Sequence, residues 1–168
     1  MDRERSDSME GAMNLMHLNG IVRQAVKLVR GVRIDQQPEA FNFTVFSVIS
    51  WFKVREVYPM SGEPRQFKRR DLRRGKALGW VEPHEQELHV RLEWGDPHGG
   101  TGTDHFRLIS PEELHIESVL RVDGQLARYV TVYHRKPDRH RGGRGSHKGD
   151  HDHHSHDDEQ DDERRAGK

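Results

Sequence analysis

The chain has 168 residues, which suits one folded domain with an appendage and leaves little room for two domains. Hydrophobic residues make up 32% and charged residues 33%, and the mean hydropathy of −1.01 indicates that part of the chain does not pack. The absence of cysteine excludes disulfides and cysteine-based zinc or nucleophile sites. The charged N-terminus does not resemble a signal peptide, and no apolar run approaches the roughly 20 residues of a membrane-spanning helix. We therefore expect a cytoplasmic protein.

The N-terminal part shows apolar side chains at helical spacing. A methionine-rich stripe from Met9 to Met16 ends at the pair Asn19-Gly20, which breaks the pattern. A second stripe runs from Ile21 to Val29, and Gly31 suits the position that follows a helix end. This part of the chain therefore predicts a hairpin of two short helices.

From residue 32 onward the apolar pattern has a period of two, and Gly, Pro and Asp divide the chain at strand-length intervals. The clearest segment alternates Leu88, Val90, Leu92 and Trp94 with polar residues, so one face meets an interior and the other meets water. The pattern is typical of an antiparallel meander. We predict about nine strands, at residues 32–36, 41–48, 51–58, 65–70, 76–82, 87–94, 102–109, 114–122 and 126–135.

The last part of the chain, residues 137–168, contains no large apolar side chain. Because it has little to bury, we expect a disordered tail that follows a single β domain at residues 1–136. The tail is rich in histidine and aspartate, which bind late divalent metals weakly and without selectivity. Its candidate metal ligands are His151, His153, His154 and His156.

An ordered set of short segments accompanies the predicted helices and strands. The set comprises Phe52-Lys53-Val54-Arg55-Glu56-Val57, the Gly62-Glu63 turn, the step from Leu88 to Trp94, the step from Arg107 to Leu114, and Thr131-Val132-Tyr133-His134-Arg135. Over about residues 6–136 it resembles the intracellular lipid-binding (fatty-acid-binding protein) family of the calycin, lipocalin-like superfamily. The resemblance implies a mainly β fold, an antiparallel up-and-down β-barrel of about nine to ten strands with an N-terminal helix-turn-helix lid. It also implies carriage of an apolar small molecule such as a fatty acid or related lipid.

This chain departs from the family pattern in two respects. The Gly-x-Trp strand that opens the family's barrel is absent, and such a gap predicts unpaired backbone groups on edge strands. The family holds a ligand carboxylate with two inward arginines and a tyrosine, and by position Arg107 is the first arginine and Tyr133 the phenol. Thr131 stands where the second arginine belongs, which predicts a weaker or less acidic ligand. If Phe106 and Leu108 point inward, strand alternation turns Arg107 toward solvent.

Two further aromatic residues are candidate ligand contacts. Tyr129 shares a strand face with Thr131 and Tyr133, and Trp94 ends the clearest strand. The alternative interpretation is that these aromatic side chains only fill a core.

A basic run from Lys68 to Lys76 contains six Lys or Arg residues. It suggests transient contact with an anionic membrane, although a solvated edge is the commoner use of such a run. No recognition motif accompanies it, so specific nucleic-acid binding is not expected. A non-catalytic interaction protein that acts through this run and the tail is therefore an alternative function.

The same strand pattern allows functions other than a lipid carrier. Lipocalins and heme-binding nitrobindin-like barrels share the strand pattern, and heme would need an inward histidine such as His105 or His115. The chain lacks Gly-x-Ser-x-Gly, His-Glu-x-x-His and a phosphate loop, so we expect neither an enzyme nor a cofactor.

Overall fold

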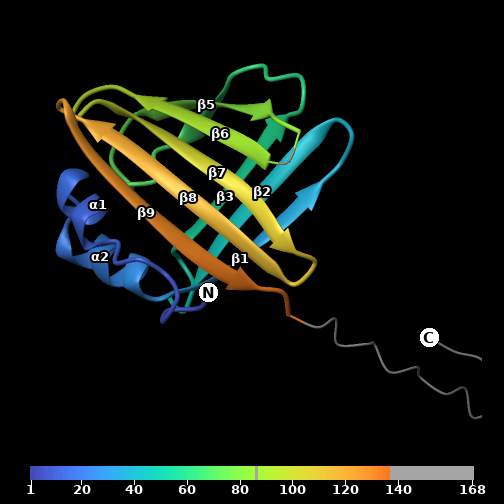
Figure 1. Cartoon of the computed structure of the whole chain (residues 1–168). Helices are drawn as coiled ribbons and strands as arrows, with labels where there is room; N and C mark the ends of the chain where they lie inside the picture. The colour runs from blue at the N-terminus through green and yellow to red at the C-terminus, as the bar shows by residue number, and fades with distance from the viewer. Residues whose placement is uncertain (86, 137–168) are drawn as a thin grey trace, which may run out of the picture. The chain divides into compact units, whose positions relative to one another are not determined.

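The computed structural model describes residues 1–85 and 87–136 (Figure 1). The predicted tail and its candidate metal ligands, His151, His153, His154 and His156, lie outside these residues. The described elements are α1 (Glu10–Leu15), α2 (Gly20–Lys27), β1 (Val29–Gln36), β2 (Ala40–Ser47), β3 (Lys53–Pro59), β4 (Arg65–Lys68), β5 (Lys76–Pro83), β6 (Glu87–Trp94), β7 (Gly100–Ser110), β8 (Glu113–Val122) and β9 (Gln125–His134).

The strands form two antiparallel sheets, one of three strands in the order β1-β2-β3 and one of six strands from β4 to β9. The two sheets face each other, and α1 packs against β9 (Figure 1). The prediction of a mainly β, antiparallel fold with a helical hairpin is confirmed. The prediction of a closed barrel is wrong, because the two sheets do not join into a continuous barrel.

Side chains join the two sheets between β3 and β4, where no backbone ladder connects them. Tyr58 of β3 is fully buried and packs on Phe67 of β4 with ring centroids 4.7 Å apart. A Cβ on Gly79 of β5 would come within 3.0 Å of Tyr58 and 3.1 Å of Phe67, so this glycine makes room for both rings. Aromatic packing therefore replaces strand pairing at this edge.

The N-terminal segment covers the outer edge of β9. The backbone N–H groups of Asp2 and Asp7 donate to the carbonyl oxygens of Val132 and Val130, each at 2.8 Å. In return the Ser6 hydroxyl accepts from the N–H of Val132 at 2.9 Å, and the Asp7 carboxylate accepts from that of Val130 at 2.8 Å. These bonds satisfy groups that the absence of an opening strand was expected to leave unpaired.

Arg5 fastens this segment through a bidentate ion pair with Glu113 of β8, at 2.6 and 2.8 Å. This hydrogen bond from Arg5, followed by one from His115, lowers the pKa of Glu113 from 4.5 to about 2. A carboxyl whose pKa is lowered by folding stabilises the folded state above its unfolded pKa, and that contribution is lost as the pH falls toward the folded pKa.

We expect Arg5→Gln to raise the Glu113 pKa toward 4.5, because the largest cause of its lowering is removed. An NMR titration of the Glu113 side-chain carboxyl measures this midpoint directly. In denaturant unfolding, the stability difference between the parent and Arg5→Gln should be present above pH 4.5 and should vanish toward pH 2. An unchanged Glu113 midpoint in Arg5→Gln would contradict the ion pair.

The main core fills the space between the sheets. Phe106 of β7 makes edge-to-face contacts with Phe41 and Phe43 of β2, each with ring centroids 5.2 Å apart. A second apolar cluster lies between α2 and the loop before β3, where Val22, Ala25, Val29 and Phe52 are buried together. The helical hairpin is therefore fixed to the domain by its own apolar face.

The first strand begins earlier than predicted. Val29 pairs with Ser47, and Gly31 lies inside β1 beside a bulge, so Gly31 does not end a helix. A Cβ on Gly31 would lie 3.2 Å from the Phe46 ring, which explains a small residue at this position. Tertiary packing on β2 has here overridden the local helical pattern.

Candidate ligand-binding site

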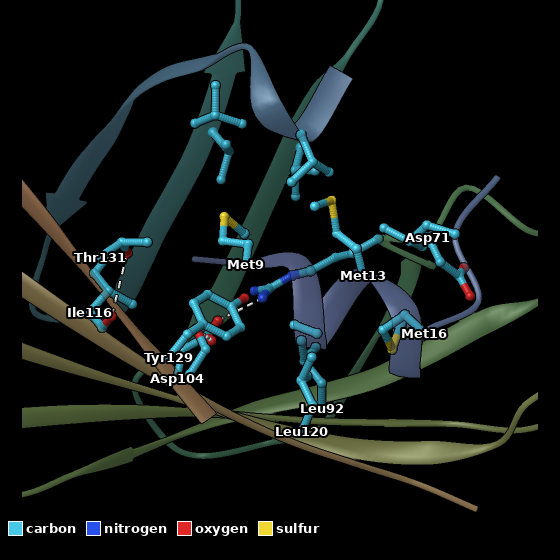
Figure 2. A pocket seen from close by; sticks show the side chains of 18 of the residues that line it. Met9, Met13, Met16, Asp71, Leu92, Asp104, Ile116, Leu120, Tyr129 and Thr131 are labelled. Carbon is cyan, nitrogen blue, oxygen red and sulfur yellow. Dashed lines mark hydrogen bonds and ion pairs between the residues drawn. The ribbon is translucent and has the colours of Figure 1, made fainter. Parts of the chain in front are cut away.

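A cavity of about 190 Å³ lies between the sheets, next to the helical hairpin. Met9, Met13 and Met16 line it from the lid, and Figure 2 shows them above Leu92 and Leu120 of the six-stranded sheet. Typical pockets for drug-sized ligands measure about 300–1,000 Å³. Methionine side chains are flexible enough to change the shape of such a space. The cavity as it stands therefore suits a short apolar chain.

Four of the five predicted ligand contacts line this cavity. They are Tyr129, Thr131 and Tyr133 of β9, together with Trp94 of β6. Burial raises the pKa of Tyr129 to about 12 and also raises that of Tyr133, so both phenols remain protonated hydrogen-bond donors. The Thr131 hydroxyl donates to the Ile116 carbonyl oxygen at 3.4 Å. Contact with a ligand stays a prediction for all four residues.

Arg107, the fifth predicted ligand contact, does not line the cavity. Its side chain is 57% exposed and donates to Glu87 at 3.0 Å on the outer face of the sheet. Phe106, its neighbour in β7, is buried between the sheets. Because adjacent strand residues point to opposite faces, an inward Phe106 requires an outward Arg107.

Arg70, in the loop after β4, is one of two arginines among the described residues that line the cavity. Its guanidinium donates to both carboxylate oxygens of Glu56 at 2.9 and 2.6 Å, and to Asp104 at 2.6 Å. Ser118 donates to the other Asp104 oxygen at 2.6 Å, and the Tyr58 hydroxyl donates to Glu56 at 2.6 Å. We call these five residues the cavity polar cluster, of which Arg70, Asp104 and Ser118 line the cavity.

Two carboxylates face one guanidinium in this cluster, so its formal charge is −1. Burial disfavours the Arg70 charge, but Glu56 and Asp104 outweigh burial and raise the pKa of Arg70 well above its usual value. The other arginine that lines the cavity, Arg69, is buried and paired with Asp71 at 2.7 Å. Both arginines are therefore already engaged by carboxylates.

One signal for this cluster was present in the sequence, namely the strand positions of its two acidic residues. Glu56 and Asp104 occupy strand positions that alternate with neighbours pointing to the opposite face, and both are buried. A carboxylate at a buried strand position needs a cation nearby. Only the folded chain shows that the cation comes from the basic run.

The basic run Lys68–Lys76 is partly internal. Arg69 is buried, with hydrogen bonds to the carbonyl oxygens of Gly95 at 2.6 Å and Pro97 at 3.0 Å. Arg70 belongs to the cavity polar cluster, and Arg73 bonds to the lid. The exposed cations that remain are Lys68, Arg74 and Lys76. The surface charge is thus smaller than the sequence suggests, and membrane contact stays a prediction.

Arg73 connects the lid to the loop after β4. Its guanidinium donates to the carbonyl oxygens of Met16 at 3.1 Å and His17 at 2.7 Å, at the end of α1. Asp71 holds the same guanidinium at 3.4 Å. This contact ties the methionine-lined side of the cavity to the sheet.

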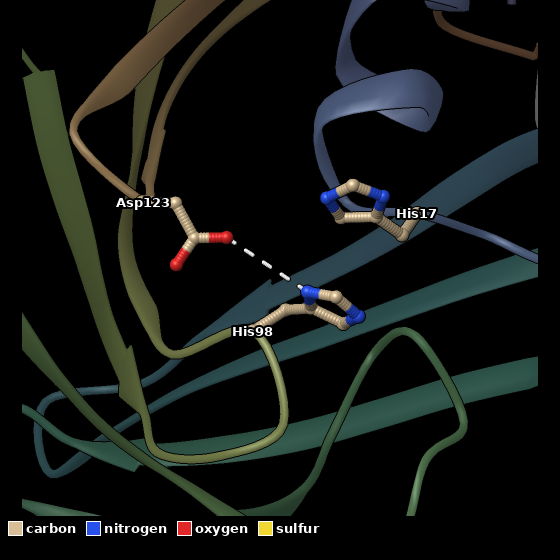
Figure 3. Close-up of side chains that lie close together, drawn as sticks. All are labelled: His17, His98 and Asp123. Atoms are coloured by element: carbon tan, nitrogen blue, oxygen red, sulfur yellow. Dashed lines mark ion pairs between the residues drawn. The ribbon is translucent and has the colours of Figure 1, made fainter.

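Three side chains from distant loops meet beside the lid. The His17 and His98 rings stack with centroids 4.2 Å apart, and His98 Nδ1 lies 3.8 Å from an Asp123 carboxylate oxygen (Figure 3). All three residues have positive φ, of 48°, 56° and 50°. They link the α1–α2 turn with the loops before β7 and before β9.

The structure does not place a histidine where a heme carrier would need one. No histidine is among the described residues that line the cavity. His115 bonds to Glu113 at 2.7 Å, and His105 packs against His89 across the outer face of β6 and β7. The inward histidine that the heme alternative requires is therefore not found at His105 or His115.

No helix within the described residues has the length and apolar character that crossing a bilayer would require.

Comparison with known proteins identifies the fold. No family model and no curated protein sequence matches the chain. A fatty acid-binding protein from brain tissue of Drosophila melanogaster superimposes with a TM-score of 0.60 at 14% identity, covering 78% of this chain and 92% of that one. Lipid binding protein 8 of Caenorhabditis elegans superimposes with a TM-score of 0.60 at 11% identity, covering 78% of this chain and 89% of that one. Zebrafish ileal bile acid-binding protein complexed with cholic acid superimposes with a TM-score of 0.54 at 15% identity, covering 78% of this chain and 94% of that one. At such identities the likeness establishes architecture, so this chain has the fold of fatty-acid- and bile-acid-binding proteins.

Proposed function

We propose that this chain is a divergent member of the intracellular lipid-binding family and that it carries an apolar small molecule, bound noncovalently in its cavity. The observation that carries the proposal is an apolar, methionine-lidded cavity in a fold that lipid-binding proteins share. Removal of apolar surface from water, at about 25 cal/mol per Å², supplies the affinity. The proposed function is non-catalytic.

The cavity polar cluster favours a ligand with an uncharged polar end. A free carboxylate would enter beside Asp104, which lines the cavity and shares the single Arg70 guanidinium with the buried Glu56. Like charges in a site of low dielectric repel strongly. A hydroxyl or amide can instead accept from the Tyr129 or Tyr133 phenol and donate to Asp104. The expected ligand is therefore a medium-chain alcohol or amide rather than a fatty acid.

The test is a titration of the full chain with N-phenyl-1-naphthylamine, an uncharged fluorescent apolar probe. Saturable binding at one site is expected, with displacement by decanol or decanamide at lower concentration than by decanoate. Absence of saturable binding by a cooperatively folded sample would refute the carrier function. Equal or stronger displacement by decanoate would refute the preference for an uncharged head group while leaving the carrier function intact.

Arg73→Ala should accelerate release of the bound probe by about tenfold or more, because the variant loses two charge-assisted hydrogen bonds to the lid, each worth about 1.5–3 kcal/mol, and about 1.4 kcal/mol is a tenfold change. Stopped-flow dilution of the probe complex measures the release rate. Arg74→Ala, an exposed neighbour, is the matched control and should release the probe at the parental rate. Identical rates in the two variants would show that Arg73 does not restrain the lid.

A further inference from the structure

Outside the cavity, the outer face of β5, β6 and β7 carries a group of acidic and imidazole side chains. The strand register places Glu82 of β5 directly opposite His89 of β6, and His89 opposite His105 of β7. His84 follows in the turn after β5, and its ring centroid lies 3.9 Å from that of His89. One ligand atom each of Glu82, His84 and His89 lies within 4.8 Å of the others.

His89 is the unusual member of this group. It is only 8% exposed although it points away from the core, because the rings of His84 and His105 cover it. Its Nδ1 is buried and has no hydrogen-bond partner among the described residues. Leaving such an atom unsatisfied costs about 1–3 kcal/mol. A buried nitrogen without a partner needs a physical explanation.

The other ring nitrogen of His89 determines what Nδ1 can do. His89 Nε2 lies 3.0 Å from a carboxylate oxygen of Glu87, and the second oxygen of Glu87 accepts from Arg107 at 3.0 Å. A carboxylate only accepts hydrogen bonds, so Nε2 donates to Glu87, and in the tautomer with its proton on Nε2 the free lone pair is on Nδ1. Metal-bound histidines commonly show this arrangement, in which a carboxylate orients the ring from behind.

Glu82 is held in a similar way. Its two oxygens accept from the Trp80 ring N–H and from Arg91, each at 3.0 Å, which fixes the carboxylate on the sheet face. Each oxygen retains a second lone pair. Arg91 is the cation nearest to this carboxylate and competes with a metal for it, so the affinity should be moderate.

We propose that Glu82, His84 and His89 Nδ1 form a binding site for a divalent late transition metal such as zinc. Two imidazoles and a carboxylate are a common zinc ligand set that leaves a fourth tetrahedral position open. Ligand atoms on one tetrahedral zinc lie about 3.4 Å apart, given bonds of about 2.0–2.1 Å. The ligand atoms lie within 4.8 Å of one another, and the exposed His84, in the turn after β5, can move to bring them closer. Arg107, which the sequence placed at a ligand carboxylate, here orients Glu87 and through it His89.

The His17, His98 and Asp123 group is a weaker candidate and serves as an internal control (Figure 3). His17 and Asp123 are exposed, so water satisfies their polar atoms without a metal. None of the three has a buried polar atom that lacks a partner among the described residues.

The experiment uses the full chain with its tail histidines replaced by asparagine, so that weak binding by the tail does not contribute. The replaced residues are His140, His147, His151, His153, His154 and His156. Zinc affinity is measured by competition with a chromophoric chelator, and cobalt substitution reports coordination by visible absorption. One zinc per chain is expected, with a rise in Tm on zinc addition.

His84→Gln should weaken zinc binding by more than about tenfold without changing the fold, since even an outer partner of a ligand is worth about 10–100-fold. Glu87→Gln, the outer partner, should weaken zinc binding by about 10–100-fold.

The double variant His17→Gln/His98→Gln is the control and should bind zinc as the tail-substituted parent does. Loss of zinc in that double variant, retention in His84→Gln, or absence of stoichiometric zinc in the parent would each overturn the proposal. Loss in His105→Gln with retention in His84→Gln would assign the metal to another set and also overturn it.

Discussion

Arg70→Met should lower the free energy of unfolding by about 3–5 kcal/mol, because the variant leaves two buried carboxylates without their cation. Glu56 and Asp104 side chains are 2% and 9% exposed, so water cannot replace the guanidinium. Methionine keeps much of the aliphatic volume, which separates the loss of charge pairing from the loss of packing. Urea unfolding followed by circular dichroism measures the change.

Two variants make the Arg70 prediction specific. Arg74→Met removes an exposed arginine from the same loop and should change stability by less than about 0.5 kcal/mol. The triple variant Glu56→Gln/Arg70→Met/Asp104→Asn removes all three charges and should recover much of the lost stability, since neutral groups cost less to bury. A loss below about 1 kcal/mol in Arg70→Met would show that the cluster is not the buried ion network described above.

Asp104→Asn should raise the affinity for decanoate relative to decanol by about 10–100-fold. The substitution takes one negative charge from the cavity polar cluster and frees one arm of Arg70, which then donates to a ligand carboxylate. A hydrogen bond to a charged group contributes about 1.5–3 kcal/mol, and each 1.4 kcal/mol is a tenfold change in affinity. Displacement of the bound fluorescent probe by the two ligands measures the ratio.

Asp123→Asn is the matched control for this gain of carboxylate binding. It makes the same chemical change in an exposed turn, at a positive φ that asparagine tolerates, and should leave the decanoate-to-decanol ratio unchanged. If Asp104→Asn binds both ligands as the parent does, the charge of the cluster does not select the head group. If neither the parent nor Asp104→Asn binds the probe, the carrier function itself is wrong.

The strands could be predicted from the sequence because each depends on local alternation of apolar and polar residues. In β6, apolar Leu88, Val90 and Leu92 point inward at every second position, which requires no knowledge of partners. The order of the elements follows from the same pattern and from the turn residues between them. The predicted start of β1 is wrong because Val29 and Arg30 fit a helix locally, whereas pairing with β2 decides their conformation.

Alternation also contained the answer for Arg107, since an inward Phe106 turns Arg107 outward. Resemblance by position favoured the cavity for Arg107, and the sheet geometry overruled it. Tyr133 was identified by resemblance, and Tyr129 and Thr131 because they share its strand face; all three line the cavity.

By itself, the sequence determined a mainly β, antiparallel fold with a helical hairpin, the positions of most strands, and the shared strand face of Tyr129, Thr131 and Tyr133, because all of these depend on spacing along one segment. The tertiary structure alone decided that the sheets stay open between β3 and β4 and that residues 2–7 cover the edge of β9. It also decided that Arg70 lines the cavity and pairs with both Glu56 and Asp104. These features join residues that lie far apart in the sequence, and no local periodicity encodes which distant side chains come within hydrogen-bonding distance.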